Sequence, residues 1–142
     1  MAARKLGLGL DVVEVRSLDD FENAFATIVS RRPEALYIDG ASLAYARRQE
    51  IADFALAHRL PATYGLKAYA QAGLLITYGL DLSENYRRAA TFVDKIVRGA
   101  HPRDLPVEQP SKFELVINLK TAKAIGITIP QSLLLRADEI IE

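Results

Sequence analysis

The residues best suited to bind a ligand lie where the predicted strands end. Open α/β sheets bind ligands in the crevice outside the carboxyl ends of their strands, so polar and aromatic side chains at these points are the first candidates. The candidate ligand-binding residues are Ser17, Asp39, Gly40, Ser42, Tyr64, Gly65, Lys67 and Tyr78.

Two of these strand ends carry a Tyr-Gly pair, at residues 64–65 and 78–79. Tyrosine rings on one rim would stack on an aromatic or apolar ligand, and the glycines would let the ligand approach the backbone. A second interpretation stays open, in which the tyrosines cap the sheet and the glycines only turn the chain.

Other candidates are suited to a ligand carboxylate. Ser42 and the backbone N–H groups of Gly40 and Gly65 are hydrogen-bond donors, and Lys67 would pair with the carboxylate through its charge. Lys67 is also explained as a solvated lysine at the start of a helix, so both interpretations are kept.

The sequence offers no constellation for catalysis or metal binding. Cysteine is absent, which excludes disulfides, Cys-based zinc sites and thiol catalysis. His58 and His101 have no metal-ligand spacing and are interpreted as surface residues, while Gly7 and Gly9 precede a predicted strand, where a dinucleotide-binding loop would follow one. We therefore expect neither an enzyme nor a bound metal or cofactor.

The composition indicates one folded domain. The chain has 142 residues, of which 50% are hydrophobic and 25% charged. Its 18 basic residues balance its 18 acidic ones, so bulk charge favours neither nucleic acid nor an anionic membrane as a partner. No apolar run is long enough to span a bilayer, and the sequence as written shows no export signal.

Alternating strand and helix patterns fill residues 1–82. Short β-branched or apolar runs predict strands at 9–15, 35–38, 61–64 and 73–78, and helical patterns separate them, including one at 42–58. This order favours an α/β fold of three layers, with a mainly parallel sheet of about five strands covered on both faces.

A long amphipathic helix follows at residues 83–99, with Ser83 predicted as its N-cap and Gly99 as the residue after its end. Four prolines make residues 100–112 an extended crossing segment. In the last part, 113–142, we predict a strand at 113–117, a helix capped by Asn118 and ended by Gly126, and a helical stretch at 130–141. Together these parts make a single α/β lobe.

Two blocks of sequence are specific enough to suggest a family. Residues 78–99 and 104–130, above all the run LPVEQP at 105–110, closely resemble the C-terminal part of ABC transporter substrate-binding proteins of the tryptophan/tyrosine-binding type. The similarity extends over essentially the whole chain. It implies one lobe of a periplasmic-binding-protein type I fold, which normally has two lobes that close on a solute and deliver it to a membrane permease.

The resemblance covers only the second lobe. It implies a truncated, non-enzymatic solute-binding lobe for a small solute, aromatic or amino-acid-like, with an ABC permease as partner. Because a cleft needs two walls, we expect weak capture by this lobe alone. The resemblance implies a periplasmic location; the absence of a signal peptide implies the cytoplasm if the chain as given is complete.

The resemblance also implies that residues 83–98 lack their usual seat on the other lobe. Tyr86, Val93, Ile96 and Val97 would then face water. We expect this helix either to fold back onto its own sheet or to dock on a second copy, giving a homodimer through residues 83–112 with exchange of the linker as one form. The alternative function is a stand-alone α/β homodimerisation module with no small-molecule ligand.

Overall fold

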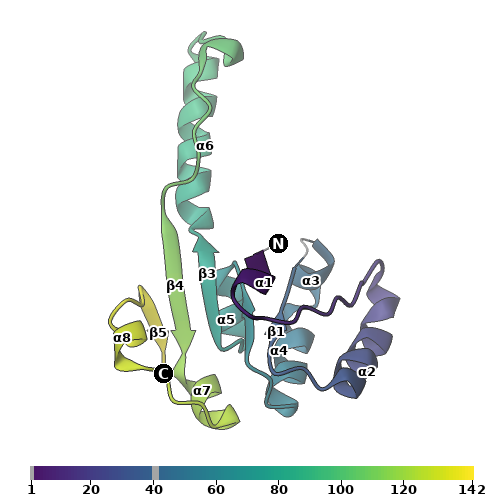
Figure 1. Cartoon of the computed structure of the whole chain (residues 1–142). Coiled ribbons are helices and arrows are strands. Elements are labelled where there is room, and N and C mark those ends of the chain that lie inside the picture. The colour runs from purple at the N-terminus through teal and green to yellow at the C-terminus, as the bar shows by residue number, and fades with distance from the viewer. Residues whose placement is uncertain (1, 40–41) are drawn as a thin grey trace.

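Five short strands form one sheet in the computed structural model, which describes residues 2–39 and 42–142 (Figure 1). They follow one another across the sheet in chain order, and β1, β2 and β3 are parallel. β4 runs antiparallel to β3, and β5 runs parallel to β4. The predicted class, an α/β lobe with a mainly parallel sheet, is confirmed. The strands are β1 (Leu36–Tyr37), β2 (Ala62–Tyr64), β3 (Ile76–Leu80), β4 (Phe113–Asn118) and β5 (Glu139–Ile141).

Helices connect these strands and vary widely in length. The α-helices are α1 (Ala2–Lys5), α2 (Phe21–Arg31), α3 (Ser42–Ala46), α4 (Arg48–Ala57), α5 (Lys67–Ala72), α6 (Leu82–Val97), α7 (Leu119–Ile125) and α8 (Gln131–Leu134). Two short 3-10 helices are η1 (Leu18–Asp20) and η2 (Pro102–Asp104). The helix predicted at 42–58 is divided into α3 and α4 at Arg47, whose φ of −101° and ψ of 18° depart from helical values.

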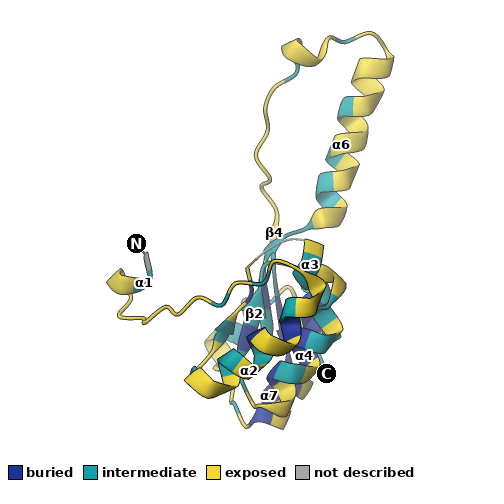
Figure 2. Cartoon of the chain, turned by 90° about the vertical axis from the view of Figure 1, so that its right-hand side faces the viewer, coloured by how far each residue is buried: buried dark blue, intermediate teal, exposed yellow. Residues whose placement is uncertain are grey.

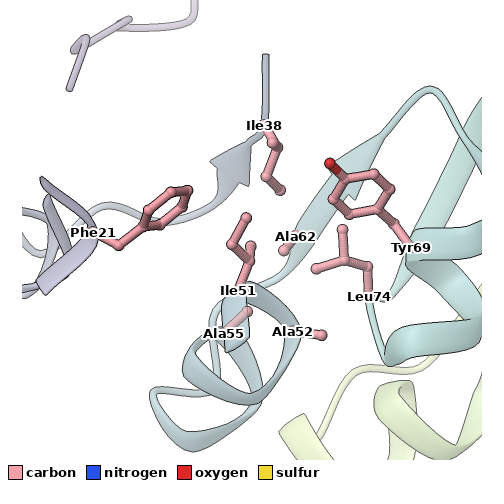
Figure 3. Packing of buried hydrophobic residues seen from close by; sticks show 8 residues of the cluster. All are labelled: Phe21, Ile38, Ile51, Ala52, Ala55, Ala62, Tyr69 and Leu74. Atoms are coloured by element: carbon pink, nitrogen blue, oxygen red, sulfur yellow. The ribbon is translucent and has the colours of Figure 1, made fainter. Parts of the chain in front are cut away.

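The main hydrophobic core joins α2, α4 and α5 to the start of the sheet (Figure 3). On α4, Ile51, Ala52 and Ala55 are spaced so that they share one face of the helix, and all three are buried. They lie with Phe21, Ile38, Ala62, Tyr69 and Leu74 in one cluster. A smaller cluster holds α7 through Leu75, Ala122 and Ile125.

The two faces of the sheet are covered unequally. Tyr64, Thr77 and Val116 are paired across β2, β3 and β4, so they share one face, and Thr77 and Val116 are buried. Tyr37 and Tyr78 belong to the opposite face and are 66% and 64% exposed. The first face is therefore the better covered of the two at the centre of the sheet.

The strand predicted at residues 9–15 is wrong. Residues 8–16 contain neither helix nor strand. Arg31 of α2 instead holds this segment, because its guanidinium donates to Asp11 Oδ1 at 2.6 Å and to the carbonyl of Val12 at 3.3 Å. A β-branched run becomes a strand only where a neighbouring strand offers backbone partners.

The fifth strand comes instead from the C-terminus. The helix predicted over 130–141 stops after Leu134, and β5 pairs with β4. Leu115 N donates to Asp138 Oδ2 at 2.7 Å, and Asp138 N donates to the carbonyl of Leu115 at 2.9 Å. These two bonds set the register in which Ile140 and Ile141 join the sheet.

α6 projects away from the rest of the fold (Figures 1 and 2). It contains no buried residue, so the prediction that it folds back onto its own sheet is wrong. Its N-cap is Asp81 rather than the predicted Ser83, because Asp81 Oδ1 accepts from Glu84 N at 3.2 Å. Gly99 follows the helix with a φ of 100°, as predicted.

The remaining caps near the C-terminus agree with the sequence. Asn118 Oδ1 accepts from Thr121 N at 3.0 Å and so caps α7. Gly126 ends that helix with a left-handed φ of 80°.

Candidate functional site

A polar pocket of about 560 Å³ lies where β2 and β3 end, where β4 begins and where α6 leaves the sheet. This is the edge at which a sheet of this kind binds ligands. Its walls come from α3, α5, the start of α6 and the strand ends. The lining residues are Tyr45, Leu66, Lys67, Ala68, Gln71, Leu80, Asp81, Leu82, Ser83, Arg87, Lys112 and Glu114.

One wall of the pocket carries Lys67, at the first position of α5. Its ammonium forms a half-buried ion pair with Glu139 of β5. The hydrogen bond to Glu139 raises the pKa of Lys67. This pair connects the first helix after β2 to the last strand, so Lys67 is a cation held in a fixed place rather than a freely solvated lysine.

A second ion pair lies where α6 leaves β3. Lys112 Nζ and Asp81 Oδ2 are 2.8 Å apart, and Asp81 also caps α6. The hydrogen bond from Lys112 lowers the pKa of Asp81, and the bond to the backbone of Glu84 adds to the effect. Asp81 is therefore a carboxylate at neutral pH.

Glu114 is a further charged group of the pocket. It lies opposite Gly79 in the β3–β4 pairing. Burial raises its pKa, and the charge of Lys67 opposes that rise. Arg87, which also lines the pocket, pairs with Glu84 at 3.3 Å. The pocket thus combines three cations that are already paired with carboxylates and a further acid that accepts protons more readily than an exposed glutamate, an arrangement suited to a small solute carrying both charges.

The two Tyr-Gly pairs do not form one aromatic rim. Tyr64 is paired with Thr77, the residue before Tyr78, so the two tyrosines point to opposite faces of the sheet. The ring of Tyr64 packs on Tyr69 with centroids 4.4 Å apart, whereas that of Tyr78 stacks on Phe113 at 5.8 Å. Neither tyrosine is among the residues lining the pocket.

Gly79, the glycine of the second pair, has a packing role. A Cβ atom built on Gly79 would lie 1.8 Å from the carbonyl oxygen of Gly65. The ends of β2 and β3 therefore approach so closely that a side chain at position 79 does not fit. This close approach lies two residues before Lys67 on one chain segment and two residues before Asp81 on the other.

The other predicted residues lie outside the pocket lining. Ser17 is exposed beside η1, where its backbone N–H donates to Asp20 Oδ2 at 2.8 Å. Asp39 is exposed at the end of β1, near enough to Tyr64 that its charge adds to the effect of burial in raising the pKa of that phenol. Ser42 is exposed at the start of α3, and Gly40 lies outside the described residues.

Sequence reasoning placed only Lys67 in the pocket. Tyr45 lies one helical turn after the predicted Ser42, a spacing that could have identified it. Asp81 directly follows β3, and the sequence shows this acidic residue at a predicted strand end. The remaining charged lining residues lie far along the chain from the predicted strand ends, and no local pattern links them to those ends. They are Arg87 of α6, Lys112 just before β4 and Glu114 of β4.

Neither a metal centre nor a membrane span is found in the described part of the chain. Residues 2–39 and 42–142 contain no cluster of three His, Asp or Glu side chains placed to hold a metal ion. No helix among them has the length and apolar character needed to cross a bilayer.

A family model described as ABC transporter substrate binding protein matches residues 1–141. The chain belongs to this family. Members of the family bind small solutes, work with ABC permeases, are in general non-catalytic and are usually periplasmic. No curated protein sequence matches the chain.

Solved structures share this fold. A conserved domain protein from Vibrio cholerae O1 biovar El Tor has a TM-score of 0.89 at 24% identity, and the ABC domain in complex with L-Trp from Streptococcus pneumonia has 0.88 at 24%. Both matches cover 98% of this chain and 47% of the other. The third structure is the ligand-free, open form of CD0873, a substrate-binding protein with adhesive properties from Clostridium difficile. It has a TM-score of 0.66 at 16% identity, and the match covers 99% of this chain and 46% of that one. The chain therefore spans about half the length of these structures.

Proposed function

We propose that this substrate-binding-family chain is a solute-binding lobe whose pocket between α5, α6 and β4 contacts a small amino-acid-like solute. The observation that carries the proposal is the charge arrangement of the pocket, in which Lys67 and Lys112 lie with Asp81 and Glu114 where β2 and β3 end and β4 begins. A zwitterion offers one carboxylate and one ammonium. Its carboxylate would share Lys67 with Glu139 or Lys112 with Asp81, and its ammonium would pair with Glu114.

The size and surroundings of the pocket support this class of solute. A volume of about 560 Å³ lies within the usual range for small-molecule sites, roughly 300 to 1,000 Å³. Tyr45 adds one ring to the wall, on which an aromatic side chain would pack. The neighbour from Streptococcus pneumonia, described in complex with L-Trp, supports an aromatic amino acid as the first solute to test.

The residues predicted at the other strand ends keep a secondary role in the proposal. Asp39 and Ser42 do not line the pocket, but Ser42 begins the helix that carries Tyr45. Delivery to an ABC permease and a periplasmic location follow for this chain if it acts as other family members do. For the lobe of residues 1–142 studied by itself, we expect a dissociation constant on the order of millimolar.

The test is an amide NMR titration with L-tryptophan, L-tyrosine and L-leucine at millimolar concentration. We expect concentration-dependent shifts confined to residues 66–68, 80–83 and 112–114. Lys67→Met removes the cation and should weaken binding at least about fivefold. Glu139→Gln breaks the same ion pair but keeps the Lys67 ammonium, so it should weaken solute binding less than Lys67→Met does. Comparing the two variants shows whether the solute needs the ammonium itself or only the ion pair.

A surface control is Lys123→Met on α7, which lies outside the pocket and should leave the titration unchanged. Shifts centred elsewhere on the fold would contradict the proposed site. No shift with any amino acid would contradict the proposed function and favour the interaction module instead.

A further inference from the structure

Among the described residues, every cation that lines the pocket already has a carboxylate partner in the same lobe. The three ion pairs are Lys67 with Glu139, Lys112 with Asp81 and Arg87 with Glu84. A solute carboxylate can reach one of these cations only by sharing it or by displacing the carboxylate that is already there. Because one carboxylate then replaces another, the exchange contributes little free energy to binding.

Glu114 is the charged lining residue that lacks such a partner. No ion pair or hydrogen bond joins its carboxylate to any residue in 2–39 or 42–142. Its neighbour across the β3–β4 ladder is Gly79, which has no side chain that could bind or cover the carboxylate. Burial raises the pKa of Glu114, so this group has lost part of its contact with water without gaining a partner. A cation placed beside it would recover that free energy.

The charges around Glu114 cancel one another. Two cations lower the pKa of Glu114 and two carboxylates raise it, and these groups are Lys67, Lys112, Asp81 and Glu139. Because the four belong to two ion pairs, together they present no net charge to a solute. The charge that this wall of the pocket leaves for a solute to meet is therefore the negative charge of Glu114 itself.

We propose that the pocket selects its solute by an ammonium group bound to Glu114, and that a carboxylate on the solute contributes less to binding. This inference rests on the proposed function, because it concerns the same pocket. The class of solute is a primary amine with an aromatic group, for which Tyr45 offers a ring on the pocket wall. Aromatic amino acids belong to this class, and so do the amines that remain when the carboxylate is removed.

Three compounds that share an indole ring test this selection in an amide NMR titration at pH 7. L-Tryptophan carries both charged groups, tryptamine carries only the ammonium, and indole-3-propionate carries only the carboxylate. We expect tryptamine to bind within about fivefold of L-tryptophan, because the contact with Glu114 is kept. We expect indole-3-propionate to bind at least about tenfold more weakly than L-tryptophan, because its carboxylate must compete with those already in place and Glu114 stays unpaired.

Two variants test the partner of the ammonium. Glu114→Gln keeps the size of the side chain and should weaken tryptamine binding at least about tenfold, because a charge-assisted hydrogen bond becomes a neutral one. Lys67→Met should lower the affinity for L-tryptophan more than the affinity for tryptamine, which has no carboxylate for Lys67 to meet. The matched control is Glu34→Gln, an exposed residue that does not line the pocket, and it should leave both affinities unchanged. Circular dichroism will verify that each variant keeps the fold.

The outcomes separate this inference from the proposed function. Binding of indole-3-propionate as tight as that of L-tryptophan, with tryptamine unbound, would overturn selection by the ammonium and leave a solute-binding pocket. Unchanged tryptamine binding in Glu114→Gln would overturn the role of Glu114 in the same way. Absence of shifts with all three compounds would contradict both the selection and the proposed function.

Discussion

Gly79 of β3 lies against the backbone of Gly65, at the end of β2, so closely that a methyl group at position 79 would stand 1.8 Å from the Gly65 carbonyl oxygen. This approach joins the two strand ends that carry Lys67 and Asp81. It also explains why a glycine follows Tyr78, because a side chain at position 79 would collide with the Gly65 backbone.

Gly79→Ala should therefore destabilise the lobe by about 3 kcal/mol, since the backbone atoms it meets cannot move aside as a flexible side chain would. Urea unfolding followed by circular dichroism measures the change. Gly9→Ala is the control, because that position has open space around it and no positive φ, and its stability should stay within about 0.5 kcal/mol. Equal effects at the two positions would contradict the steric explanation.

Tyr69→Phe should leave stability unchanged or raise it by about 1 kcal/mol. The Tyr69 ring is fully buried, and its hydroxyl has no hydrogen-bond partner among the described residues. Removing an unpartnered buried hydroxyl costs nothing in hydrogen bonding. A loss of more than about 1 kcal/mol in urea unfolding would indicate a partner for this hydroxyl.

The same residue predicts an alkaline transition. Burial raises the pKa of Tyr69 to about 12 from the ordinary value of 10. A raised folded pKa means that the contribution to stability is complete below pH 10 and is lost as the pH rises from 10 toward 12. The free energy of unfolding, measured between pH 10 and 12, should fall more steeply in the original protein than in Tyr69→Phe. Parallel curves for the two proteins would contradict the assignment.

Asp81→Asn should change the acid dependence of stability. The pKa of Asp81 is lowered by the hydrogen bond from Lys112, so its contribution is present above the unfolded pKa of about 3.8 and is lost as the pH falls below it. The variant should be less stable at neutral pH, and the difference should shrink below pH 4. Thermal unfolding at several pH values measures this, and a difference that persists at pH 2 would show a cause other than charge.

Asn118→Ala should cost about 2 to 3 kcal/mol. Asn118 is buried, caps α7 through Thr121 N, and donates from Nδ2 to the carbonyl of Ala70 at 2.9 Å. The substitution removes both bonds and leaves buried backbone groups without them. Asn23→Ala, on the exposed side of α2, is the control for the same change of residue type. Urea unfolding should show a clearly larger loss of stability for Asn118→Ala than for Asn23→Ala.

Local patterns in the sequence were reliable where the chain itself supplies the partners. The amphipathic helix predicted at 83–98 is present as Leu82–Val97, and the cap at Asn118 and the ends at Gly99 and Gly126 are also present. All of these depend on contacts within a few residues. The predicted strand at 9–15 failed because a strand needs a partner that local sequence does not reveal. β5 was missed for the same reason, since its register depends on Asp138 reaching Leu115.

By itself, the sequence determined the α/β class, the family and the edge of the sheet where ligands are expected, since these depend on hydrophobic periodicity, strand order and a specific run of residues. Only the tertiary structure decided which side chains meet there. The face to which a strand residue points depends on pairing register, which separated Tyr64 from Tyr78 and brought Lys112 and Glu114 to Lys67 across more than forty residues of chain. Long-range pairing of this kind leaves no signal in local sequence.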